Sequence, residues 1–162
     1  MHNISFLYLE EQPMKQQKTV DFHIRWAWQR ISRLYNNEAM KNGFTMSIGY
    51  VLLNIDTQTG TPSTKLGPKM GMEPRSLTRT LKSMEEMGLI ERRPDPDDRR
   101  LVRVFLTNLG KAKRKVSRET VIRFNESLQG QIEPQKLSVF FEVIEHFNHL
   151  LDTDSLLKEK TT

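Results

Sequence analysis

The chain contains no cysteine among its 162 residues. Disulfide bonds, thiolate-bound zinc and a thiol-based redox sensor are therefore excluded, because each of them requires the cysteine sulfur. The absence of cysteine also suits a reducing cytoplasm. At this length, and with a hydrophobic share of 36%, the chain can bury a core of ordinary size without covalent cross-links.

Long apolar runs are also absent from the sequence. No stretch approaches the roughly 18 apolar residues that a membrane-spanning helix requires. The apolar segment "ISFLYL" (residues 4–9) is short, and acidic residues follow it instead of the small residues of a signal-peptide cleavage site. The sequence therefore predicts a soluble, cytoplasmic protein.

Motifs of enzymes are missing as well. The sequence has no glycine-rich phosphate loop, no local signature of a Ser-His-Asp arrangement and no zinc-protease helix motif. His146 and His149 lie three residues apart with Glu142 and Glu145 nearby, a spacing that could seat a metal ion. Exposed helix histidines are the simpler interpretation, since no further ligand is in view. We therefore expect no catalytic residue, no cofactor and no metal site.

Basic residues are present in excess, and their distribution is uneven. Residues 62–115 contain 14 Lys and Arg against 7 Asp and Glu, a net charge of +7, whereas the rest of the chain has a net charge of −2. A local positive excess favours a polyanionic partner such as DNA, through counterion release and electrostatic steering. The charge distribution alone leaves one alternative open, in which these basic residues contact only solvent and bind no partner.

The spacing of apolar residues predicts a mainly helical chain. Apolar residues recur at three- and four-residue steps over residues 15–41, which predicts a long first helix that Gly43 ends. Thr45 is a good N-cap for a second helix. Its expected buried stripe consists of Ile48, Val51, Leu52 and Ile55.

Two shorter helices are predicted next. Thr61 can cap a third helix that has Pro62 at its first position and ends at about Met70, before Gly71. A fourth helix runs from Pro74 to Met87 and ends at Gly88. Its buried face is expected to hold Leu77, Leu81 and Met84, and its opposite face Arg75, Arg79 and Lys82.

The period then changes to that of a strand. In "RLVRVFLT" (residues 100–107), Val102, Val104 and Leu106 should point to one side and Arg103 to the other. The preceding "PDPDD" (residues 94–98) has the composition of a turn. Two strands joined by this turn would form a hairpin with a charged tip.

Two helices complete the chain. The first begins at Asn108 with Thr107 as its N-cap, and the second begins at Pro134. The second carries a wide apolar stripe of Leu137, Phe140, Phe141, Ile144, Phe147 and Leu151. Residues 1–18 are expected to be an N-terminal arm, and residues 152–162 a frayed tail. A short helix, a turn, a helix with a basic outer face and a hairpin form a winged helix-turn-helix.

The segments "LTRTLKSMEEMGLIERR" (77–93) and "DPDDRRLVRVFLTNLG" (95–110) resemble the core of the MarR family of bacterial transcription regulators. The shared features are Thr-Arg near the middle of the recognition helix, the Gly-Leu-Ile step, a D-x-R wing and the final V-x-L-T. The segment "LGPKM" (66–70) departs from the family pattern. The resemblance implies a mainly α fold with a small β-hairpin. It implies a MarR-like domain over residues 19–151, in which the winged helix-turn-helix (about 45–107) lies between dimerisation helices (about 15–41 and 108–151).

A recognition helix enters the major groove and reads base edges with its outward side chains. Arg75 and Arg79 are the best candidates for guanine, because a guanidinium can bridge its O6 and N7 atoms. Ser76, Thr78 and Lys82 could reach bases or phosphates. Ser63, Thr64 and Lys65 begin the preceding helix, whose free amides suit a phosphate. Solvent contacts alone are the alternative for these side chains.

The wing would carry arginine to the minor groove, where the negative potential is enhanced when the groove is narrow. By the family resemblance, Asp98 pairs with an arginine and braces the tip, while Arg99 or Arg100 enters the groove. Asp95 and Asp97 would cap amides of the loop. An arginine–aspartate cluster that only stabilises the hairpin is the alternative, although exposed ion pairs contribute little.

The expected function is sequence-specific DNA binding by a homodimer at a near-palindromic operator, with repression as the expected outcome. By the resemblance, the effector would be a small acid, which in the family is often aromatic. Trp28, Tyr35 and Tyr50 are candidate contacts, with Trp26 and Arg30 nearby. Plain core packing is the alternative for these aromatics. Two other functions stay open: an architectural DNA-binding protein without operator choice, and a winged-helix module for protein docking.

Overall fold

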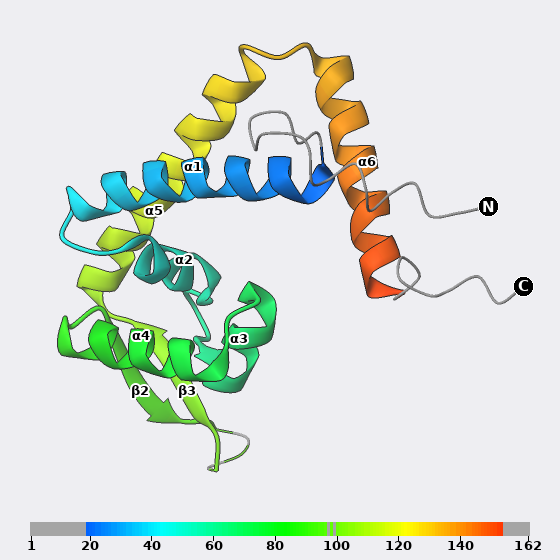
Figure 1. Cartoon of the computed structure of the whole chain (residues 1–162). Coiled ribbons are helices and arrows are strands. Elements are labelled where there is room, and N and C mark those ends of the chain that lie inside the picture. Colours follow the sequence, from blue (N-terminus) through cyan, green and yellow to red (C-terminus); the bar gives the residue numbers. More distant parts are fainter. Residues whose placement is uncertain (1–18, 97, 99, 154–162) are drawn as a thin grey trace, which may run out of the picture. The chain divides into compact units, whose positions relative to one another are not determined.

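The computed structural model describes residues 19–96, 98 and 100–153. These residues divide into two compact units, one that extends to Arg118 and one that begins at Glu119. The predictions for residues 1–18, Asp97, Arg99 and residues 154–162 lie outside the described residues. The predicted fold class is confirmed: six helices accompany one small antiparallel sheet in the described part of the chain (Figure 1).

The first two helices of the first unit are α1 (Val20–Met40) and α2 (Met46–Asn54). Thr45 caps α2 as predicted, because its Oγ1 accepts a hydrogen bond from the Ile48 amide at 3.3 Å. The predicted apolar stripe of α2 is buried in the core of this unit. The core continues into the other helices and the sheet through Leu66, Leu77, Leu81, Met84, Leu89 and Val104.

A short strand precedes the third helix, and the sequence did not predict it. Strand β1 (Thr61–Pro62) pairs with β3 and leads directly into α3 (Ser63–Met70). The prediction of Thr61 as the cap of α3 is therefore wrong, since Pro62 occupies that position. The Thr61 Oγ1 instead accepts a hydrogen bond from the Asp56 amide at 2.9 Å. Gly71 ends α3 as predicted, with a left-handed φ of 58°.

Helix α4 (Pro74–Glu86) and the hairpin of β2 (Ile90–Pro94) and β3 (Val102–Leu106) follow. The strands form an antiparallel sheet in the order β1-β3-β2, and the hairpin extends beyond the helices of this unit (Figure 1). Val104 and Leu106 are buried as expected, but Val102 is 40% exposed. The strand alternation therefore continues past the end of the core.

Helix α5 (Asn108–Gln129) begins against the end of the hairpin. Thr107 caps it as predicted, accepting a hydrogen bond from the Gly110 amide at 3.0 Å. A Cβ atom on Gly110 would lie 1.9 Å from the Leu89 carbonyl oxygen, so only glycine permits this approach. Further along α5, Lys113 donates a hydrogen bond to the Asn42 carbonyl at 2.7 Å. These contacts fix the start of α5 to the rest of the first unit.

The second unit contains the last part of α5 and helix α6 (Pro134–Asp152). None of the residues of α6 is buried within this chain. Phe140 and Phe141, both 53% exposed, contact each other edge to face with ring centroids 5.6 Å apart. Nowhere in residues 19–153, as far as they are described, is a helix long and apolar enough to cross a membrane.

Candidate nucleic-acid interface

Helix α4 separates a buried apolar face from an exposed basic face. Leu77, Leu81 and Met84 pack into the core with 6% exposure or less. The opposite face exposes the predicted basic residues Arg75, Arg79 and Lys82. Apolar residues at three- and four-residue intervals anchor one side of the helix, so the charged side is presented to the surroundings. This is the geometry that a recognition helix requires.

The predicted polar residues of α4 lie along its exposed side. Thr78 is exposed, and its hydroxyl donates to the Pro74 carbonyl at 2.9 Å, which leaves the oxygen lone pairs available as acceptors. Ser76 is half-buried. Lys82 lies 3.8 Å from Glu86, and both side chains are at least 65% exposed. Such an exposed pair is weak, so Lys82 can exchange this partner for a phosphate.

The start of α3 contributes a second polar surface. Ser63 is half-buried, whereas Thr64 and Lys65 are exposed in the first turn. Pro62 provides no side-chain cap for the helix. The first amides of the helix therefore lack a side-chain acceptor, and an external anion can accept hydrogen bonds from them.

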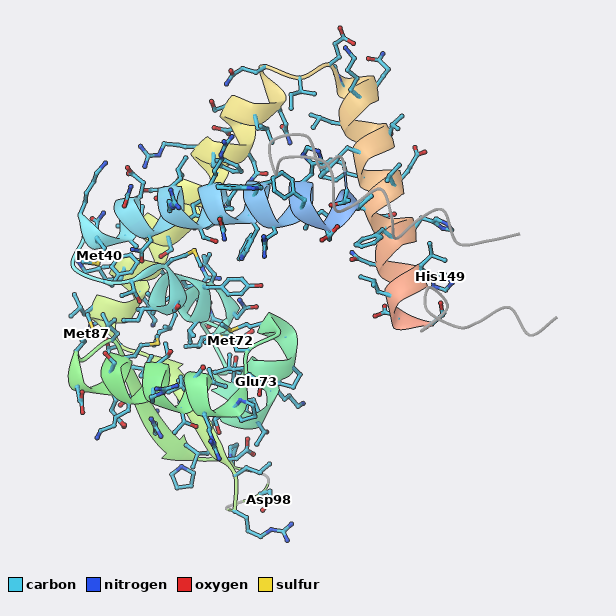
Figure 2. All side chains as sticks on the ribbon, viewed as in Figure 1. Met40, Met72, Glu73, Met87, Asp98 and His149 are labelled. Atoms are coloured by element: carbon cyan, nitrogen blue, oxygen red, sulfur yellow. The ribbon has the colours of Figure 1, made fainter. Side chains whose placement is uncertain are left out.

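A groove separates α3 from α4. It is lined by Ser63 and Thr64 of α3, Thr78 of α4 and Arg92 of β2, among others. Met72 and Glu73, in the turn between the two helices, lie at one end of α4 (Figure 2). Arg92 was not among the predicted residues; its Nε lies 3.1 Å from Glu85. The feature that could have identified Arg92 is its position on the first strand of the hairpin, because that strand runs beside α4.

The tip of the hairpin carries an aspartate–arginine pair. Arg100 donates from Nε and Nη2 to the two carboxylate oxygens of Asp98 at 3.0 and 2.9 Å, and the Arg100 amide also donates to Oδ1. Hydrogen bonds from the Arg100 side chain lower the pKa of Asp98, and they raise the pKa of Arg100. The Arg100 side chain is nevertheless 90% exposed. The pair thus orients a guanidinium outward at the end of the wing, where Figure 2 labels Asp98.

The loop end of the hairpin strands contains a buried ion pair that the sequence did not predict. Asp95 is 4% exposed, and its Oδ2 lies 2.8 Å from both Nε and Nη2 of Arg103. The expected amide cap by Asp95 is also present, from the Asp98 amide, but it is long at 3.4 Å. The ion pair is therefore the principal role of Asp95. The period of the strand indicated that Arg103 faces away from Val104 but did not indicate its partner.

The candidate effector contacts lie on α1 and α2. Trp28 and Tyr50 are 56% and 44% exposed, and Tyr35 is half-buried, which raises the pKa of its phenol. The two described hollows, one between α3 and α4 and one beside Leu34 and Met40, are lined by other residues. His146 and His149 are both exposed. Within residues 19–153, as far as they are described, no cluster of three or more potential ligands could hold a metal ion.

Helix α3, its turn, the basic α4 and the hairpin together define a winged helix-turn-helix. The model of the MarR family matches residues 44–102, which contain α3, α4 and β2 but only the first residue of β3. This part of the chain is therefore similar to the MarR family, as the sequence motifs predicted. An HTH-type transcriptional regulator of Bacillus subtilis, YdgJ, is 27% identical over 79 residues. The matched residues are 49% of this chain and 48% of that protein, so the chain spans about half the length of this relative.

Solved structures share the fold over most of the chain. A MarR family transcription regulator superposes with a TM-score of 0.75 at 20% identity, covering 83% of this chain and 89% of the other. A mutant of MarR from E. coli complexed with operator DNA gives 0.70 at 23% identity, with coverages of 78% and 91%. PcaV from Streptomyces coelicolor, in complex with its natural ligand, gives 0.68 at 20% identity, with coverages of 82% and 93%. At these identities the likeness establishes the fold.

Proposed function

We propose that this protein is a transcription regulator that binds duplex DNA sequence-specifically through its winged helix-turn-helix. The observation that carries the proposal is the pairing of two basic surfaces within one unit. Helix α4 exposes Arg75, Arg79 and Lys82 beside a hairpin whose tip exposes Arg100. One surface suits the major groove and the other suits the adjacent minor groove. The family match over residues 44–102 supports the same assignment.

In the proposed complex, α4 enters the major groove. Arg75 and Arg79 bridge guanine O6 and N7, and Ser76, Thr78 and Lys82 contact neighbouring bases or phosphates. The uncapped first turn of α3, with Ser63, Thr64 and Lys65, binds a backbone phosphate and fixes the register of the recognition helix.

In the same complex the wing enters the minor groove. Asp98 holds the guanidinium of Arg100 in an extended position, so that the arginine does not fold back onto the strands. Arg99 is the other arginine predicted for this groove. Asp98 lowers the local positive charge, which weakens the attraction to DNA. It also restricts the rotamers of Arg100 before binding, so that less side-chain entropy is lost when the complex forms.

We further propose a homodimer that acts as a ligand-responsive repressor at a near-palindromic operator. The exposed apolar residues of α6 support self-association, with α1 and α5 as further dimerisation helices. Two recognition helices in a dimer would lie about 34–36 Å apart, one turn of DNA. PcaV, which shares the fold, was solved with its natural ligand, and this supports a small effector. Trp28, Tyr35 and Tyr50 are the candidate contacts on this chain.

The test is selection of duplexes from a random pool, followed by a salt series on the selected and a shuffled duplex. A regulator binds the selected duplex at least about a thousandfold more tightly than the shuffled one, with a steep salt dependence. Equal, salt-dependent binding to both duplexes would instead indicate an architectural DNA-binding protein. No binding at low salt would indicate a winged-helix module that docks on a protein.

A further inference from the structure

The buried ion pair at the loop end of the hairpin strands is part of a longer connection. The second guanidinium nitrogen of Arg103, Nη1, donates to the Thr59 carbonyl at 3.1 Å. Thr59 belongs to the loop between α2 and β1, 44 residues away along the chain. Arg103 therefore joins the start of the wing loop, through Asp95, to a loop on another part of the same unit. We call Asp95, Arg103 and the Thr59 carbonyl the wing brace.

The loop that the wing brace contacts is itself held firmly. One carboxylate oxygen of Asp56 accepts hydrogen bonds from the Gln58 and Thr59 amides at 2.8 and 2.7 Å. Gly60 follows with a φ of 67°, and a Cβ atom there would lie 2.7 Å from the Val104 carbonyl oxygen. This loop leads through β1 into α3, the first helix of the helix-turn-helix. The brace thus connects the wing to the element that precedes the recognition helix.

Arg103 is less exposed than Arg93 and Arg100, two other arginines of the wing. The Arg103 side chain is 18% exposed, against 90% for Arg100 and 58% for Arg93. Two hydrogen bonds, to Asp95 and to the Thr59 carbonyl, and an ion-pair contact between Nη2 and Asp95 already occupy the guanidinium of Arg103. Arg103 therefore presents little of its charge to a phosphate or a base. An arginine that only stabilised the hairpin would need a partner within the hairpin alone, whereas Arg103 also contacts Thr59 in the α2–β1 loop.

We propose that Arg103 is a positioning residue for DNA binding, which sets the angle between the wing and the recognition helix. This inference rests on the proposed function. Two contact surfaces on one rigid body increase the affinity for DNA only when their relative geometry lets both enter their grooves at the same time. The brace fixes the hairpin at the loop end of its strands, so that the tip arginine and the face of α4 reach adjacent grooves together. Without it, α4 still reads the major groove, but the wing no longer adds its contacts.

The decisive variant is Arg103→Lys in the full chain. Lysine keeps the charge, so the counterion contribution to binding is unchanged, but one ammonium group cannot span Asp95 and the Thr59 carbonyl as the guanidinium does. The matched control is Arg93→Lys. Arg93 is the cross-strand neighbour of Arg103, pairs with Glu91 and stacks on Phe105, and shows no contact with the α2–β1 loop among the described interactions.

The wild-type protein is first used to select a duplex from a random pool, and both variants are then measured on it. Dimethyl sulfate reports guanine N7 in the major groove, and hydroxyl radicals report the minor groove. We expect Arg103→Lys to bind about tenfold more weakly, with an unchanged salt slope. Major-groove protection should remain at saturating protein, while protection of the flanking minor groove is lost. Arg93→Lys should match the wild type in affinity and in both footprints.

The outcomes separate the two proposals. If the wild type selects no duplex, the proposed function fails. If it selects one and Arg103→Lys keeps wild-type affinity and both protections, the positioning role fails while the function stands. A uniform loss of both protections, together with a large fall in melting temperature, also overturns the positioning role. If Arg103→Lys does not fold, Asp95→Asn is measured in the same way, and failure of both variants to fold overturns positioning in favour of a purely structural pair.

Discussion

Arg100 donates hydrogen bonds from two nitrogens of its guanidinium to both carboxylate oxygens of Asp98, at 3.0 and 2.9 Å, although only one residue separates Asp98 from Arg100 in the chain. The interaction favours the charged form of both partners, since it lowers the pKa of Asp98 and raises the pKa of Arg100. The contact restricts the arginine without burying it. In the proposed complex, Asp98 is therefore a bracing residue and Arg100 is the residue that meets the minor groove.

The first prediction concerns the pH dependence of this pair. A lowered pKa means that the pair is intact above the ordinary pKa of an aspartate, near 3.9, and is lost as the pH falls through the lower folded value. Arg100→Gln should raise the pKa of Asp98 toward its ordinary value, because the side-chain hydrogen bond is its largest cause. NMR titration of the Asp98 carboxyl carbon measures it. An unchanged titration curve in Arg100→Gln would show that the pair does not persist in solution, and Arg93→Gln serves as the control.

The second prediction concerns base reading by α4. Arg79→Ala should weaken binding to a selected duplex by about 1–3 kcal/mol and relax the preference at one base pair, because a bidentate guanine contact is lost. Binding to a shuffled duplex should change much less. Fluorescence anisotropy on both duplexes measures the difference. Lys82→Ala is the comparison, since a phosphate contact should be lost equally on both duplexes. Equal losses for Arg79→Ala on the two duplexes would remove its assigned role.

The third prediction concerns the close approach of α5 to the hairpin. Alanine normally stabilises a helix relative to glycine. Gly110→Ala should instead lower the free energy of unfolding by about 2–4 kcal/mol, because its Cβ would lie 1.9 Å from the Leu89 carbonyl oxygen. Urea denaturation followed by circular dichroism measures this change. Gly130→Ala is the control, because its Cβ meets atoms no nearer than 3.5 Å. If the two variants were equally stable, the Leu89 carbonyl would not crowd a side chain at position 110.

The fourth prediction concerns self-association through α6. Phe140 and Phe141 are each 53% exposed within this chain. If they form part of a dimer interface, the double variant Phe140→Glu with Phe141→Glu should be monomeric, because two charges would be buried without partners. Light scattering coupled to size exclusion measures the mass. The control is His146→Glu, which adds a charge at an exposed polar position of the same helix. A dimer that survives the double substitution would place the interface elsewhere.

Most of the local structure could be predicted from the sequence because its causes are local. Thr45 and Thr107 cap their helices through amides three residues ahead. Gly71 ends α3 because a left-handed φ favours glycine. The apolar spacing of α4 predicted which face would be buried, and the basic face followed from it. The tip pair of Asp98 and Arg100 was implied by the family motif, and it too joins residues close in sequence.

The features that the sequence did not reveal involve residues far apart in the chain. Thr61 has the composition of a helix cap, but its pairing with Val104 makes it part of a strand. Val102 belongs to the predicted alternating strand, but its 40% exposure, which the residue pattern did not predict, shows that the core beneath it has ended. Neither outcome can be read from neighbouring residues, because each depends on what the tertiary fold brings alongside.

The sequence by itself determined the order of the helices, the basic face of α4 and the charged hairpin that follows, because these depend on residue spacing and local hydrogen bonds. The tertiary structure alone decided how the arginines of the hairpin divide their roles. Arg103 is withdrawn into contact with Asp95 and Thr59, whereas Arg100 is exposed at the tip. Both are arginines of one charged segment, and only the positions of the surrounding carboxylate and backbone groups distinguish the arginine that contacts the α2–β1 loop from the one that is exposed at the tip.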